Sequence, residues 1–218
     1  MISTRELSEL PAIERLVPLT KSIATLDAII ERNWEGRYYS FNSRWDRGEQ
    51  MASMRNGEGD HWFCVFGVLG AFLKGFHHES KMARWLNETG KLWPGILDDI
   101  PEPFNSFAKE PSFSMQETTF CIWRKHGDRQ WNKGKIAYPE GDDPDGSARL
   151  LKILDANPRT YWHWAEDYYH RPISLQLVEH MYAQKPLTEG ALHGLNPSTN
   201  IAELSDDLDE IGYSVSTN

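Results

Sequence analysis

Aromatic and polar residues alternate over residues 37–46, and this is the clearest strand pattern in the chain. Tyr39, Phe41 and Trp45 are separated by polar side chains. Alternation with a period of two is typical of a strand that buries one face. Asp46-Arg47-Gly48 follows as a turn signal. The pattern therefore predicts a β-strand that ends near residue 46.

Three further strands are expected directly after it. Residues 50–55 alternate weakly, and Asn56-Gly57 then offers residues that tolerate a positive φ. Residues 62–66 are all apolar, as in a strand covered on both faces. Gly67 to Gly70 can reverse the chain before residues 71–76 return. Short connections of this kind predict an antiparallel meander.

Helical patterns precede the strands. Ser3 and Glu6 have the spacing of a capping box and predict a short first helix. Pro11 interrupts the apolar pattern, and Pro18 should separate a second helix over residues 20–33. Together these segments form an N-terminal helical region over residues 1–35.

The sheet region is expected to span residues 36–140. A helical turn or two is predicted at 82–87, and four prolines between 90 and 111 predict a covering loop with a short helix at 104–108. Residues 118–124 are β-branched and aromatic and predict a strand. Gln130-Trp131 and residues 135–138, which Gly134 separates, predict one or two more, before an acidic loop at 139–146.

Helical spacing returns over residues 147–213. Asn157-Pro158 should begin one of these helices, with Asn157 as its N-cap. Helices, then strands, then helices predict an α+β fold with a mainly antiparallel sheet of about five or six strands. No Pro/Ser/Gly-rich linker divides the chain, so we expect one domain over residues 1–218.

Composition and charge exclude several classes of partner. The 218 residues include nine Trp and are 39% hydrophobic, which is enough apolar surface for a core. The formal net charge of −9 argues against nucleic acid and against anionic membranes. The apolar runs are too short to span a bilayer. Two cysteines in apolar runs and a charged N-terminus without a signal-peptide pattern favour a cytoplasmic protein.

One group of polar residues is predicted to meet at a rim of the sheet. If the strands at 62–66 and 71–76 pair as a hairpin, the polar residues at their outer ends meet, with Arg55 nearby. These candidate site residues are Asp60, His61, His77, His78 and Glu79. The alternative is that they are ordinary strand-end residues that satisfy backbone groups and water.

The helical segment YWHWAEDYYH is a second candidate. His163, Glu166, Asp167 and His170 are spaced i, i+3, i+4 and i+7 and share one face, where they could hold a divalent metal. The opposite face is aromatic, so a solvated polar face is the simpler interpretation.

Other reaction chemistry finds little support. The chain has no Gly-x-Ser-x-Gly elbow, no phosphate-binding glycine loop that opens a helix and no CxxC pair. We therefore assign no cofactor and no metal and lean against an enzyme.

The sequence instead favours a protein-binding function. Asp142 and Asp143 lie in the acidic loop, and Asp206 and Asp207 lie in the acidic last helix. With Trp45 and Arg55 they are the predicted binding residues, and a basic protein is the expected partner. In class, an acidic, aromatic-rich α+β domain of this kind resembles small bacterial immunity proteins, which neutralise a toxin by covering it. The alternative is a metal-dependent or acid/base hydrolase that uses the rim of Asp60, His61, His77, His78 and Glu79.

Overall fold

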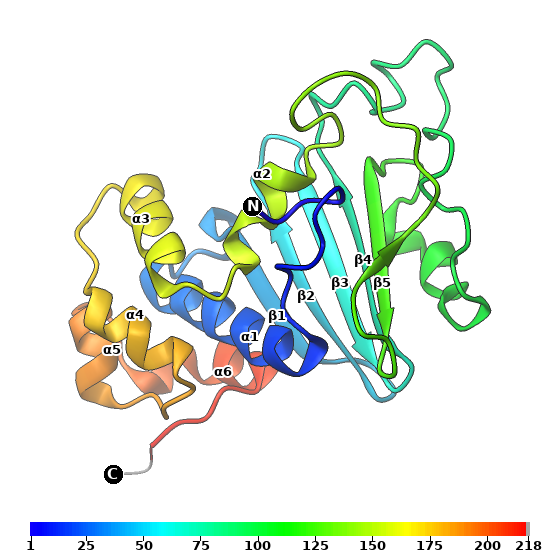
Figure 1. Ribbon diagram of the computed structural model, residues 1–218. Helices are drawn as coiled ribbons and strands as arrows, with labels where there is room; N and C mark the ends of the chain where they lie inside the picture. Colours follow the sequence, from blue (N-terminus) through cyan, green and yellow to red (C-terminus); the bar gives the residue numbers. More distant parts are fainter. Residues whose placement is uncertain (217–218) are drawn as a thin grey trace.

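A single antiparallel sheet of six strands organises the chain in the computed structural model, which describes residues 1–216 (Figure 1). The strands pair in the order β1-β2-β3-β4-β5-β6, so each strand lies beside its neighbours in sequence. They span Tyr39–Asp46, Glu49–Arg55, His61–Gly67, Gly70–Phe76, Phe120–Lys125 and Asn132–Lys133. The predicted α+β fold with a mainly antiparallel sheet is confirmed.

The turns follow from local sequence. Gly57 has a φ of 74° in the loop between β2 and β3, where Asn56 N donates to Asp60 O at 3.2 Å. A glycine is favoured there because other residues rarely adopt a positive φ. In β4, an added Cβ on Gly75 would lie 2.0 Å from the ring of Phe120 in β5. This glycine therefore lets the aromatic ring lie flat over its strand.

The N-terminal helices differ from the prediction. One continuous helix, α1 (Ile13–Ile30), contains Pro18, and it packs against β1 and β2. Only the backbone hydrogen bond to the carbonyl of Glu14 is lost at Pro18, and burial of nearly a whole side of the helix outweighs this loss. No helix forms at Ser3, because Thr4 N donates to Ser147 Oγ at 2.9 Å and ties the segment down in a turn.

Of the C-terminal helices, α3, α4 and α5 lie together to one side of α1, whereas α2 lies near the N-terminus (Figure 1). Asn157 caps α3 through its side chain, as predicted. The α-helices are α2 (Ser147–Leu151), α3 (Pro158–Tyr169), α4 (Leu175–Tyr182), α5 (Glu189–Leu195) and α6 (Ser205–Ile211). Short 3-10 helices lie at Trp34–Gly36, Glu102–Phe104, Phe107–Lys109, Pro111–Phe113, Lys152–Leu154 and Ile201–Leu204.

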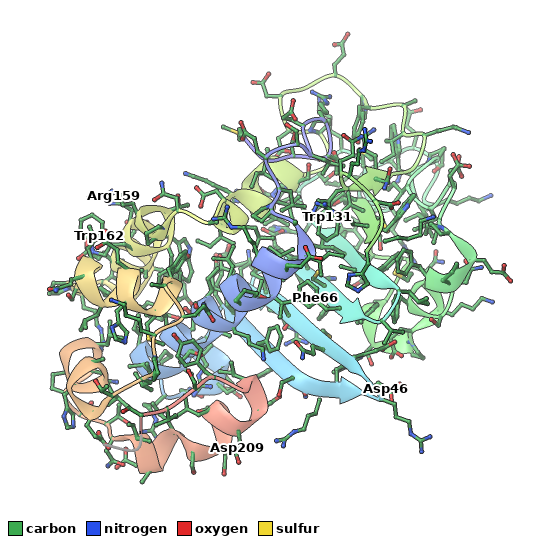
Figure 2. All side chains as sticks on the ribbon, turned by 60° about the horizontal axis from the view of Figure 1, so that its bottom comes forward. Asp46, Phe66, Trp131, Arg159, Trp162 and Asp209 are labelled. Atoms are coloured by element: carbon green, nitrogen blue, oxygen red, sulfur yellow. The ribbon has the colours of Figure 1, made fainter. Side chains whose placement is uncertain are left out.

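The sheet separates two cores. The larger core packs α1 and the C-terminal helices against one face. Figure 2 shows Phe66 beneath α1 and Trp131 near the start of that helix, where Trp131 Nε1 donates to Pro11 O at 2.8 Å. The smaller core lies under the proline-rich segment, in which Phe113 stacks on Phe63 with 5.3 Å between ring centroids.

Three predicted elements around this smaller core differ from the prediction. Residues 82–87 form turns rather than a helix, since the Asn87 side chain donates to the carbonyls of Ala83 and Lys91. The predicted strand at 135–138 is not part of the sheet. Residues 135–136 instead press against Gly95, where an added Cβ would lie 2.2 Å from Lys135 O. The short helix expected at 104–108 is replaced by two 3-10 turns.

Candidate functional site

Asp60, which precedes β3, lies at the centre of the predicted rim. Its side chain is buried, and Oδ1 accepts the backbone N–H of His78 at 2.9 Å and pairs with His78 Nδ1 at 2.7 Å. Oδ2 accepts Asn56 Nδ2 at 3.0 Å. Burial acts to raise the pKa of Asp60, but the hydrogen bonds from His78 outweigh it and the pKa is lowered. Asp60 is thus held as a carboxylate beside an imidazole.

The two histidines after β4 differ in their surroundings. His78 is partly exposed and Asp60 orients its ring, which is the arrangement of a carboxylate-histidine pair that could act as a general base. His77 is more deeply buried, its Nε2 is 4.0 Å from Asp60 Oδ2, and neither ring nitrogen has a hydrogen-bond partner within the described residues. Gly146, with a φ of 77°, packs directly on the His77 side chain.

His61 and Glu79 do not join this cluster, contrary to the prediction. His61 follows Asp60 directly, so in a strand its side chain points to the opposite face. There its Nε2 lies 2.8 Å from Lys74 Nζ. Glu79 is exposed and makes no side-chain hydrogen bond or ion pair with residues 1–216. The rim is therefore a group of Asp60, His77 and His78.

Lys74 is a fully buried lysine in the centre of β4 that the sequence analysis did not select. Its Nζ donates to Glu117 O at 2.7 Å and contacts His61. Burial lowers the pKa of Lys74 to about 7, and burial and then the nearby Lys74 charge lower the pKa of His61 to about 4. The available signal was a single lysine within the apolar run Ala71–Phe76.

A second group of predicted residues gathers beside the edge strand β1. Trp45, Arg55 and Asp207 line one hollow of about 160 Å³. The Arg55 guanidinium lies over the rings of Trp34, at 5.7 Å, and Phe63, at 5.0 Å. Three predicted binding residues that are distant in sequence are thus neighbours in the fold.

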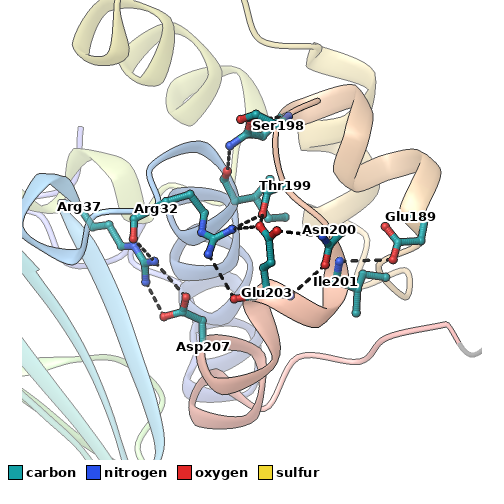
Figure 3. A network of polar contacts seen from close by, with 11 residues as sticks. Arg32, Arg37, Glu189, Ser198, Thr199, Asn200, Ile201, Glu203 and Asp207 are labelled. Atoms are coloured by element: carbon teal, nitrogen blue, oxygen red, sulfur yellow. Dashed lines mark hydrogen bonds and ion pairs between the residues drawn. The ribbon is translucent and has the colours of Figure 1, made fainter.

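Ion pairs hold α6 against this edge (Figure 3). The Arg37 guanidinium donates to both carboxylate oxygens of Asp207, at 2.6 and 3.0 Å. Arg32 pairs with Glu203 at 2.6 Å. Asp206 is exposed on α6. The acidic helix therefore stands next to the aromatic residues of the hollow.

Asp142 and Asp143 lie elsewhere, in the loop before α2. The carboxylate of Asp143 accepts the backbone N–H groups of Ala148 and Arg149, both at 2.9 Å. Asp142 is exposed, and its carbonyl accepts from Arg5. These two residues are not part of the hollow beside β1. Asp143 instead accepts hydrogen bonds from backbone N–H groups in the first turn of α2.

The four polar residues predicted to share one face of α3 have different surroundings. Glu166 accepts the backbone N–H of Ile173 at 2.9 Å, and His170 has a φ of 50° where the helix ends. His163 and Asp167 line a cavity of about 610 Å³ whose wall also includes Asp60. Among residues 1–216, no group of three or more His, Cys, Asp or Glu side chains is placed to hold a metal ion.

Comparison with known proteins does not assign this site. No protein-family model, no curated protein and no solved structure matches the chain. Within residues 1–216, the helices all lack the length and apolar character needed to cross a membrane.

Proposed function

We propose that this protein is a non-catalytic binding protein that covers a basic partner protein, in the manner of an immunity-type inhibitor. The contact region, here named the β1–α6 surface, consists of Trp34, Trp45, Arg55, Asp206, Asp209 and Glu210. It combines aromatic residues with one helix of concentrated negative charge.

The observation that carries this proposal is the exposure of Trp34 beside free carboxylates. Trp34 is 57% exposed, although it lies at the margin of the same hollow as Glu210. Asp206, Asp209 and Glu210 form no ion pair with a cation among residues 1–216. Tryptophan and arginine dominate the energetics of protein interfaces, and unpaired surface charge speeds the encounter with an oppositely charged partner.

Affinity purification from the source cells with wild-type protein, Trp34→Ala and Asp209→Lys/Glu210→Lys tests the proposal. Trp85→Ala is the matched control, because Trp85 is 52% exposed but packs on Phe76 of β4 and does not line the hollow. A basic protein retained by wild type and the control, lost from both other variants and released by salt, is expected. A partner whose retention is the same for Trp34→Ala and Trp85→Ala would contradict the proposal.

The contact between Asp60 and His78 supports a second candidate, an acid/base hydrolase. The pair at 2.7 Å would let His78 take a proton from water or from a substrate hydroxyl. Hydrolysis of aryl esters or phosphate esters that is lost in His78→Asn and kept in His126→Asn is the expected result for this candidate. Equal rates for both variants would exclude this role for His78.

A further inference from the structure

A large cavity lies between the sheet and α2–α3, and it is separate from the β1–α6 surface. Its volume is about 610 Å³, within the range of small-molecule sites. The sheet contributes Tyr38, Tyr39 and Asp60, and the helical side contributes residues from Arg149 to Asp167. The cavity therefore joins the rim predicted at Asp60 to the polar face of α3.

Three cationic side chains line this cavity without an ion-pair partner among residues 1–216. Arg149, Lys152 and Arg159 are exposed, and none forms an ion pair with a carboxylate among residues 1–216. Arg159, labelled in Figure 2, lies in the first turn of α3. In a chain with a net charge of −9, a concentration of free positive charge at one cavity indicates an anionic ligand.

The character of the wall changes along α3. Arg159, Trp164 and Asp167 all line the cavity, and the helical rise separates the first and last of them by roughly 12 Å. Tyr38 faces Trp164 with 5.0 Å between ring centroids. Arg159 near the start of α3, Trp164 in its middle and Asp167 near its end thus present positive, aromatic and acidic groups in turn along the helix.

We infer that this cavity binds a nucleoside 5′-monophosphate. Its phosphate would contact Arg159, Lys152 and Arg149, because guanidinium and ammonium groups form charge-assisted hydrogen bonds with phosphate oxygens. Its base would stack on the aromatic wall that Trp164 and Tyr38 form, and its sugar hydroxyls or exocyclic amino group would donate to Asp167.

Isothermal titration of the full chain with AMP, GMP, CMP and UMP tests the inference, with adenosine and inorganic phosphate as separate arms. At least one nucleotide is expected to bind with a Kd below about 1 mM. Arg159→Gln and Lys152→Gln should each weaken that binding by about tenfold or more. Arg129→Gln is the control, since Arg129 is exposed and lies outside the cavity.

Three results would overturn the inference. The first is the absence of binding by all four nucleotides, and the second is binding that neither cavity variant weakens. The third is inorganic phosphate binding as tightly as the best nucleotide, which would show that the aromatic wall makes no contact. Thermal unfolding of Arg159→Gln and Lys152→Gln verifies that both variants are folded, as their exposure leads us to expect.

Discussion

Lys74 Nζ and His61 Nε2 lie 2.8 Å apart beneath the covering segment of the sheet. His61 Nδ1 is 3.3 Å from Gly59 O, so a neutral His61 ring can donate from Nδ1 and accept from Lys74 at Nε2. Both groups bind protons less readily here than in an unfolded chain, because burial disfavours their charged forms. The pair therefore makes stability depend on pH.

The first prediction concerns Lys74→Met. Folding lowers the pKa of Lys74 from 10.5 to about 7, so the unfolded chain binds more protons between these values and stability rises with pH. The free energy of unfolding of wild type, relative to Lys74→Met, should increase by about 3 kcal/mol between pH 7 and pH 9.5. Urea denaturation at both pH values measures this, and a constant difference would contradict it. Lys109→Met, at an exposed site, is the control.

Asp27 has the opposite dependence on pH. Its buried carboxylate accepts Tyr38 N, Tyr39 N and the Tyr161 hydroxyl at 2.7 to 3.0 Å, and it thereby joins α1 to β1 and α3. Burial raises the pKa of Asp27 from 3.8 to about 6 despite these hydrogen bonds, so the folded chain binds more protons between those values. Its contribution to stability is fully present below about pH 4 and is lost as the pH rises to about 6.

The second prediction is that Asp27→Asn removes this dependence. The stability of wild type relative to Asp27→Asn should fall by about 2 kcal/mol between pH 4 and pH 6. Asp27→Ala should be destabilised throughout this range, since it leaves three donors without an acceptor. Thermal or urea unfolding at several pH values measures both effects. Parallel pH profiles for wild type and Asp27→Asn would show that Asp27 does not titrate in this range.

The third prediction concerns the contact of Gly75 with Phe120. Gly75→Ala should destabilise the protein by about 2 kcal/mol or more, because its methyl group overlaps the ring. Phe120→Leu removes the overlapping ring atoms, so the double variant should cost less than the sum of the single variants. Gly127→Ala adds a methyl group in open space and should have little effect. Strict additivity in urea denaturation would rule out this steric explanation.

The fourth prediction compares two ion pairs by double-mutant cycles. Arg37 is 7% exposed and binds Asp207 through two hydrogen bonds, so we expect a coupling energy of about 1 to 2 kcal/mol. Lys135 and Asp99 are 82% and 58% exposed, so solvent screens their charges and their coupling should be much weaker than that of Arg37 with Asp207. Chemical denaturation of the single and double alanine variants measures both couplings. Equal coupling energies at the two sites would mean that burial does not strengthen the ion pair of Arg37 with Asp207.

Sequence patterns predicted the elements that are stabilised by interactions between residues close together in the chain. Alternation and turn glycines located the strands from Tyr39 to Phe76, and the cap at Asn157 located α3. Predictions failed where distant contacts outweigh local preference. Pro18 stays inside a helix because that helix is buried against the sheet, and Ser3 begins no helix because Thr4 is bound to Asp145 and Ser147.

The candidate sites show the same division. Hairpin pairing brought Asp60 to His78 as predicted from sequence, but the two-residue period of the strand sent His61 to the opposite face, towards Lys74. The chain alone determined a meander of adjacent strands, because a hairpin needs only neighbouring residues. Only the tertiary structure decided that Arg159 and Asp167 share a cavity with Asp60, since such contacts depend on how α3 packs against the sheet and not on the spacing of residues along the chain.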